Sequence, residues 1–346
     1  MRRRRLVVVL VAVPIVLIAA WTVAWFVLAS MMRGEIDNAI ARFEADGGEV
    51  SLGALDVGGY PFSLAAEADD VTIRQPTGVI VAIGGLTGRA VVWAPNDVAL
   101  MLSDGLIVTV PTAPRLPPSV ITAARGAGAV DARLAGGFDA VQVSLFDVTV
   151  EPGRSPATHI DRIDATVAQP DPAGPLAVTA EAHGVELPEV PLVGFSDTVE
   201  RVAADLILSG PLPPAAYAPM VAAWRDAGGE LQVERAELVW GPLSARADGV
   251  LTLDRDLQPE GRLTARVQGF DSVVTALEEA GLVGGNQSVL VRLGLGMFAM
   301  QPDEDGVPTL VQPLRIADRR VAIGPFALPG RLPYIRWPDP PAAVVF

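Results

Sequence analysis

Residues 43–63 read FEADGGEVSLGALDVGGYPFS, and residues 224–244 read WRDAGGELQVERAELVWGPLS. The two stretches align without a gap. Each contains an aromatic residue near the end of a helical pattern, a Gly-Gly pair, a strand pattern, a break with Gly and Pro, and the start of another strand. This indicates two related helix-strand-strand modules that share one core. Chance similarity in an Ala- and Gly-rich chain is the alternative.

Upstream of the first module, a helix is predicted over residues 35–46, because Ile36, Ile40 and Phe43 recur at helical spacing. Before it, residues 6–29 contain no charged side chain. A helix of this length is about 36 Å long, which is enough to cross a hydrocarbon core of about 30 Å. We therefore expect a transmembrane helix over residues 6–29, and a cleaved secretory signal is the alternative.

Four consecutive basic residues precede this apolar run: Arg2, Arg3, Arg4 and Arg5. Basic residues beside a membrane span are retained in the cytoplasm. This predicts a cytoplasmic tail over residues 1–5 and places the rest of the chain, from residue 30 onward, on the other side of the membrane. Aromatic residues near the outer end of the run suit the membrane interface.

Downstream, short alternating segments separated by Gly, Pro, Asn and Asp predict an antiparallel meander. The fold class is therefore mainly β (α+β): a transmembrane helix followed by a long curved antiparallel sheet or groove with a few short helices. We expect turns at residues 94–97 and 103–105, a short helix at residues 119–125, and further helices at residues 215–227 and 272–280. Two β-rich halves are predicted over residues 30–210 and 211–336, followed by a flexible tail over residues 337–346.

The charge balance excludes one class of partner. Removing the four leading arginines leaves 22 basic residues against 40 Asp and Glu. Nucleic-acid binding is therefore not expected, since phosphate contacts need clustered Lys or Arg. The chain has no cysteine, which excludes disulfides, thiol nucleophiles and Cys-ligated metals.

Two places are candidates for an apolar ligand. Tyr60 and Phe62 lie in a Gly/Pro break that either holds a ligand or forms a sheet corner with both rings packed inward. Residues 288–300 are almost entirely apolar and predict a buried strand or a helix. That segment either lines a lipid groove or belongs to the core, and its candidate groove residues are Leu293, Leu295 and Met297.

Motifs for catalysis or metal binding are missing. His159 and His183 lack ligand partners at metal-binding spacing, and the acidic residues 303–306 form only a fragment of a calcium loop. We find no Gly-x-Ser-x-Gly elbow, Walker loop or Rossmann fingerprint. We therefore expect a protein that is not an enzyme and has no metal and no cofactor.

The Arg-rich membrane helix, the sequence Gly-Tyr-Pro-Phe at residues 59–62, Trp-Gly-Pro at residues 240–242 and Val-Ala-Ile-Gly-Pro at residues 321–325 resemble the alphaproteobacterial DUF2125 family. More loosely, the chain is similar to AsmA-like envelope proteins. That similarity implies a bacterial inner-membrane anchor and a periplasmic β-groove associated with lipid movement. The expected function is to bind or guide an apolar ligand such as lipid in envelope maintenance, and a scaffold for envelope proteins without its own ligand is the alternative.

Overall fold

The computed structural model describes residues 2–45, 47–111, 117–133, 137–153, 156–188, 194–211, 217–279, 301–302, 307–324, 326–327 and 330–337, with the side chains of the first helix described from Ala19 onward. The elements are α1 (Arg2–Ala45), β1 (Glu49–Ser51), β2 (Leu55–Gly58), β3 (Ser63–Arg74), β4 (Ile80–Val91), β5 (Ala94–Val110), β6 (Ser119–Ala132), β7 (Phe138–Pro152), β8 (Thr158–Ala168), β9 (Leu176–Glu186), β10 (Thr198–Ser209), α2 (Ala218–Asp226), β11 (Glu230–Trp240), β12 (Leu243–Leu253), β13 (Pro259–Gln268), α3 (Phe270–Glu279), β14 (Gln301–Pro302), β15 (Pro308–Ala317), β16 (Arg320–Ile323) and β17 (Phe326–Ala327).

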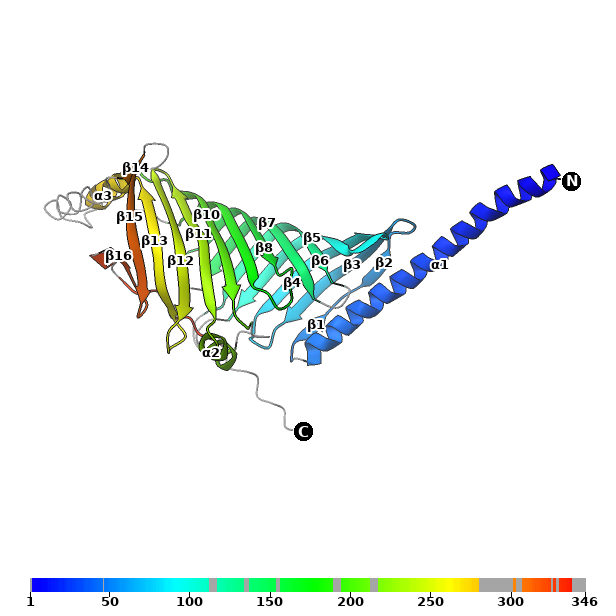
Figure 1. Cartoon of the computed structure of the whole chain (residues 1–346), viewed down its shortest axis with the longest axis horizontal. Helices are drawn as coiled ribbons and strands as arrows, with labels where there is room; N and C mark the ends of the chain where they lie inside the picture. Colours follow the sequence, from blue (N-terminus) through cyan, green and yellow to red (C-terminus); the bar gives the residue numbers. More distant parts are fainter. Residues whose placement is uncertain are drawn as a thin grey trace, which may run out of the picture.

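The strands form one long open antiparallel sheet (Figure 1). From β2 to β13, each strand pairs with the next strand in the sequence, and β15 then pairs with β13. β1 also pairs with β3, beyond the end of β2. The predicted mainly β meander is therefore confirmed, because short turns between consecutive strands leave antiparallel neighbours as the simplest pairing.

Helix α1 runs past the β1–β3 end of the sheet and extends beyond it toward the N-terminus (Figure 1). It continues through Gly34 without a break. Among the residues that the structure describes, no helix is long and apolar enough to cross a membrane. Much of the apolar run predicted over residues 6–29 precedes Ala19, so its side chains lie outside the described part.

The two Gly-Gly pairs end their helices in the same way. Gly47 and Gly228 have φ angles of 88° and 82°. The following amides, of Gly48 and Gly229, donate to the carbonyls of Phe43 and Trp224 at 3.1 and 2.9 Å. In both modules a Cβ on the second glycine would overlap the aromatic ring of the helix. The matched sequence stretches therefore share one helix stop, in which glycine is needed for the conformation and for the space.

A crease crosses the sheet from β3 to β10. Four alternate strands, β3, β5, β7 and β9, each contain a residue in the left-handed region: Asp70, Asp104, Asp147 and Gly184. In a regular strand, every second residue points to the same face. Across the crease the spacing is three: Leu145 and Val148, on either side of it, lie on the same face. The crease thus keeps apolar side chains on one face along strands of up to 17 residues.

Three predictions of local structure are wrong. Residues 119–125 form the start of β6 and not a short helix, because pairing with β5 and β7 overrides local propensity. Residues 94–97 and 103–105 lie within β5 and not in turns. In the Ser-Asp-Gly sequence at residues 103–105, Asp104 and Gly105 adopt the left-handed conformation at the crease. Asp and Gly adopt this conformation in turns as well, so the same residues also favour a turn.

Other expectations hold. The helices predicted at residues 215–227 and 272–280 are α2 and α3, and the ambiguous segment 199–209 is the strand β10. The sheet passes from the predicted first half into the second through the β10–β11 ladder. Residues 288–300 and 338–346 lie outside the described residues.

We predict that Gly229→Ala lowers the free energy of unfolding by about 1–3 kcal/mol, the usual cost of overpacking, because the new methyl group overlaps the Trp224 ring. The midpoint of chemical unfolding, followed by tryptophan fluorescence, measures this change. Gly34→Ala is the control, since its Cβ meets no atom within 4 Å and alanine favours the helix. Equal midpoints for the two variants would contradict the shared helix stop.

Candidate functional site

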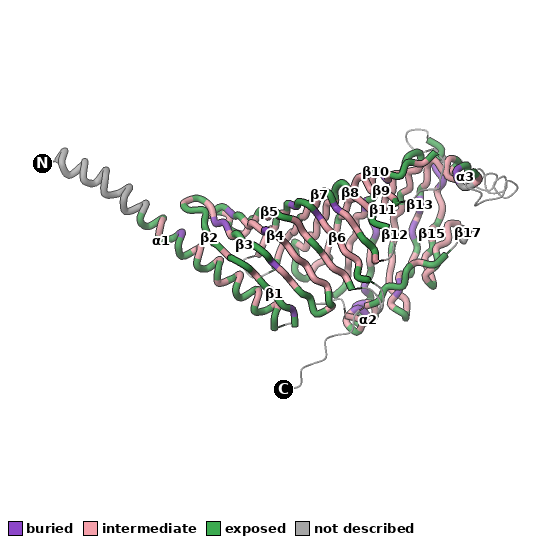
Figure 2. Tube along the Cα trace, turned by 180° about the vertical axis from the view of Figure 1, so that it is seen from behind, coloured by how far each residue is buried: buried purple, intermediate pink, exposed green. Residues whose placement is uncertain are grey.

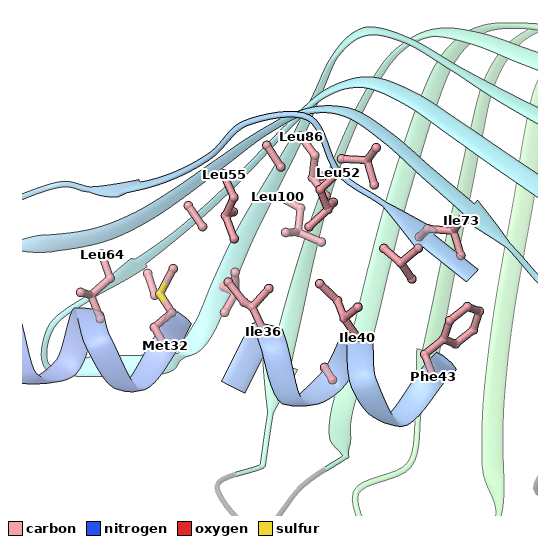
Figure 3. A pocket seen from close by; sticks show the side chains of 18 of the residues that line it. Met32, Ile36, Ile40, Phe43, Leu52, Leu55, Leu64, Ile73, Leu86 and Leu100 are labelled. Carbon is pink, nitrogen blue, oxygen red and sulfur yellow. The ribbon is translucent and has the colours of Figure 1, made fainter. Parts of the chain in front are cut away.

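An apolar groove of about 490 Å³ lies between the C-terminal half of α1 and strands β1–β5 (Figure 3). Its volume is within the range of small-molecule sites, roughly 300–1,000 Å³. All nineteen lining residues are apolar: Met32, Ile36, Ala39, Ile40, Phe43, Val50, Leu52, Leu55, Leu64, Ala66, Ala68, Val71, Ile73, Leu86, Gly88, Ala90, Pro95, Val98 and Leu100. The groove therefore suits a hydrocarbon ligand.

The sequence builds the groove from two periodicities. On α1, Met32, Ile36, Ile40 and Phe43 recur every three or four residues and face the sheet (Figure 3). On β3 to β5, every second residue faces the helix, except at the crease. Several of these strand residues are Ala or Gly, whose small side chains leave space beneath the helix that larger residues would fill.

Side-chain hydrogen bonds hold α1 beside the hairpin of β2 and β3. Trp21 and Trp25 donate their indole N–H groups to the carbonyls of Pro61 and Ser63, at 2.9 and 2.8 Å. The hydroxyl groups of Thr22 and Tyr60 are 2.8 Å apart. Trp25 is only 4% exposed, so its bond is well protected from water. These contacts fix the position of the helix and thereby the width of the groove.

The apolar face continues far beyond the groove. Directly paired residues from β3 to β15 form an unbroken apolar row: Ala68, Leu86, Leu102, Gly126, Leu145, Ile163, Ala182, Val202, Leu238, Ala245, Val267 and Leu310. A parallel row runs from Val98 on β5 to Leu314 on β15. At about 4.8 Å per strand, this face extends over about 50 Å. Most strand residues are half-buried rather than buried (Figure 2).

A second, smaller apolar pocket of about 260 Å³ lies on the same face, beneath α2. Its lining includes Trp224 of the second module and Trp337 near the C-terminus. The segment before Trp337 is held by Gln258, which is 1% exposed and exchanges two hydrogen bonds of 2.9 Å with the backbone of Ile335. Trp337 itself donates to the carbonyl of Leu257 at 2.8 Å. Each module thus places an apolar pocket between its helix and the sheet.

The opposite face carries charged residues in paired positions. Arg235 on β11 contacts Asp205 on β10 at 2.6 Å and Glu237 at 3.0 Å. Arg201 on β10 bridges Glu237 at 2.5 Å and Glu181 on β9 at 3.4 Å. These ion pairs link three neighbouring strands and help to fix their register.

Hydrogen bonds from arginine lower the pKa values of carboxyl groups on this face. The hydrogen bond from Arg235 is the main cause that lowers the pKa of Asp205. Burial by itself would raise the pKa of Glu237, but hydrogen bonds and charge from Arg201 and Arg235 outweigh it and lower the pKa. The same balance lowers the pKa of Asp164, whose partners are Arg162 and Ser144. All three carboxyl groups are therefore committed to structural pairs and ionised at neutral pH.

The histidines take part in similar surface pairs. His159 lies 3.8 Å from Asp161, and His183 lies 3.3 Å from Glu181. Within the described residues, no group of three or more His, Cys, Asp or Glu side chains is arranged to hold a metal ion. Residues 303–306, the fragment of a calcium loop, lie outside this part of the chain.

Two of the sequence-predicted ligand residues, Tyr60 and Phe62, lie away from the groove. Tyr60 and Phe62 do not line it; both rings are exposed at the β2–β3 turn, so neither packs inside the sheet. Leu293, Leu295 and Met297 lie outside the described residues. In the sequence, Ile36, Ile40 and Phe43 form a helical pattern, which does not by itself indicate a site. The signal in the sequence that could have indicated the groove is the apolar stripe of this helix, which continues back to Met32.

The family comparison agrees with the predicted resemblance. A family model described as "Uncharacterized protein conserved in bacteria (DUF2125)" matches residues 25–333. The chain belongs to the DUF2125 family. The match begins at Trp25 in α1 and includes the groove and every strand that the structure describes, so the groove belongs to the DUF2125 region. No curated protein and no solved structure matches the chain.

We predict that Arg235→Met destabilises the DUF2125 sheet at about pH 6 by roughly 1.5–3 kcal/mol, the range for hydrogen bonds to charged groups. The folded pKa of Asp205 is below its unfolded value of about 3.9, so this stabilisation is complete above that value and is lost as the pH falls through the folded pKa. The difference from wild type should therefore shrink toward about pH 3. Urea unfolding over this pH range measures it.

Arg125→Met is the control for this prediction, because Arg125 and Asp147 form a largely exposed pair. We expect little change for this variant at any pH. A constant difference between Arg235→Met and wild type down to acidic pH would contradict the assignment to carboxylate pairing.

Proposed function

We propose that this protein is anchored in the bacterial inner membrane, with its N-terminus in the cytoplasm and its body in the periplasm, and that it binds and guides an apolar ligand such as lipid. On this proposal it takes part in envelope maintenance without being an enzyme. The uncharged run over residues 6–29 and the arginines before it support the anchor and its orientation. The looser similarity to AsmA-like proteins supports the location.

The groove is the observation that carries the proposal. All nineteen residues that line it are apolar, and it opens onto an apolar face that continues over twelve strands. An acyl chain entering such a site exchanges water for hydrocarbon contacts, which favours binding by about 25 cal/mol per Å² of buried apolar surface. The groove begins at Met32, three residues after the predicted membrane span, which is about 4.5 Å along the helix. A lipid leaving the membrane would therefore meet the groove first.

The distribution of polar groups supports a binding role over catalysis. Neither the groove nor the pocket beneath α2 is lined by an ionisable side chain. The carboxyl groups with shifted pKa values lie on the other face, where arginines pair with them. Acid-base catalysis needs a titratable group within reach of the bound ligand.

We predict that the purified full chain retains phospholipid and that Leu100→Asp abolishes this binding, because a carboxylate in the groove must be desolvated when the ligand enters. Native mass spectrometry and lipid extraction measure the ratio of lipid to protein. Met101→Asp is the matched control, since Met101 is the next residue of β5 and projects from the opposite face, with 65% exposure.

Equal lipid retention in the two variants would contradict binding in the groove. A wild-type chain free of lipid would instead favour the scaffold hypothesis. Circular dichroism checks that both variants keep the sheet.

Guiding along the face makes a separate prediction. Val202 lies on the apolar row in β10, far from the groove, and is 41% exposed. Val202→Asp should leave the retained lipid unchanged and slow the exchange of fluorescent lipid between vesicles that carry the protein. Gln232→Asp, on the opposite face of β11, is the control. Normal exchange in Val202→Asp would restrict the function to binding.

A further inference from the structure

Five aromatic side chains gather where α1 meets two neighbouring turns of the sheet. We call them the aromatic tip: Trp21, Phe26, Tyr60, Phe62 and Trp93. Trp21 and Phe26 belong to α1, Tyr60 and Phe62 to the β2–β3 turn, and Trp93 to the β4–β5 turn. Large aromatic residues are normally well buried in a folded protein, so their exposure here requires an explanation.

The two turns lie together and against the helix. The amide of Val92, beside Trp93, donates to the carbonyl of Phe62 at 3.2 Å. Trp21 donates to the carbonyl of Pro61, and the Tyr60 ring stacks edge-on against Trp25 at 5.5 Å. Phe62 and Trp93 nevertheless remain 64% and 71% exposed. The tip is therefore a fixed surface, because hydrogen bonds hold its backbone while its rings project outward.

Along α1, the tip lies in the outer part of the run predicted to span the membrane, residues 6–29. About 20 residues fill the hydrocarbon core. Counted from Leu6, that length ends at Trp25, one of the α1 residues that contact the hairpin. The tip would thus lie at the level where aromatic rings favour the boundary between hydrocarbon and headgroups.

The charge around the tip fits the same surface. Residues 19–34, 57–66 and 85–96 contain two charged side chains, Arg33 and Arg89, and both are basic. The whole chain has 40 acidic residues, and carboxylates beside the tip would repel an anionic leaflet. The three segments that form the tip thus carry no carboxylate side chain.

We infer that the aromatic tip inserts into the outer-leaflet interface of the bilayer and holds the body in one orientation, with the groove beside the membrane. The inference rests on the proposed anchor and adds a second attachment, made by the sheet itself. A helix alone leaves the body free to tilt and rotate about its exit point. Two turns seated in the interface remove that freedom and keep the entry to the groove at the lipid surface.

The chain has no cysteine, so single substitutions give unique labelling positions. Phe62→Cys and Trp93→Cys are labelled with an environment-sensitive fluorophore in the full chain, reconstituted in phosphatidylcholine vesicles. Met101→Cys is the control, because it is exposed to the same degree but lies seven residues into β5, about 23 Å from its start. All three side chains are exposed, so the sheet should tolerate the changes.

At residues 62 and 93 we expect emission at shorter wavelength, quenching by a nitroxide lipid and protection from aqueous iodide. At residue 101 we expect emission and quenching typical of water. Labels at 62 and 93 that behave like the label at 101, in a chain that stays in the vesicles after an alkaline wash, overturn the inference and leave the anchor standing. Loss of the chain from the vesicles overturns the anchor and the inference together.

Discussion

The structure depends on keeping apolar side chains on one face of a single sheet through twelve successive strands. Side chains alternate between faces with a period of two, so a register slip of one residue would move a whole strand's apolar set to the wrong face. The unbroken row from Ala68 to Leu310 shows that no such slip occurs between described strands. Where the strands bend at the crease, spacings of three residues restore the same face.

A single layer with an apolar face is an unusual solution, because most sheets bury that face against a second layer. Among the residues that the structure describes, α1 lies over β1–β5, where Ala and Gly side chains leave space, and α2 lies over the smaller apolar pocket on β10–β13. Most strand residues are half-buried rather than buried (Figure 2). The same arrangement that limits burial thus creates two pockets on one continuous apolar surface.

The two faces of the sheet contribute differently to its stability and to its strand register. Apolar residues supply the driving force for folding but tolerate exchange with one another. The charged face adds pairs with defined partners, such as Arg235 with Asp205. Each pair contributes modestly, yet pairs repeated across neighbouring ladders disfavour shifted registers. At the β1–β3 end of the sheet, hydrogen bonds from Trp21 and Trp25 join the helix to the hairpin.

The sequence by itself determined the meander, the two helix stops and the apolar run before them. Each of these follows from local periodicity, from Gly-Gly pairs and from composition, which act over a few neighbouring residues. Only the tertiary structure decided that residues 119–125 form a strand, that residues 103–105 lie in a crease, and that Met32 and Leu100 share a groove. These features depend on pairing and on contacts between residues far apart in the chain. The physical reason is that Gly and Asp favour turns and bulges alike, and the neighbouring strands choose between the two.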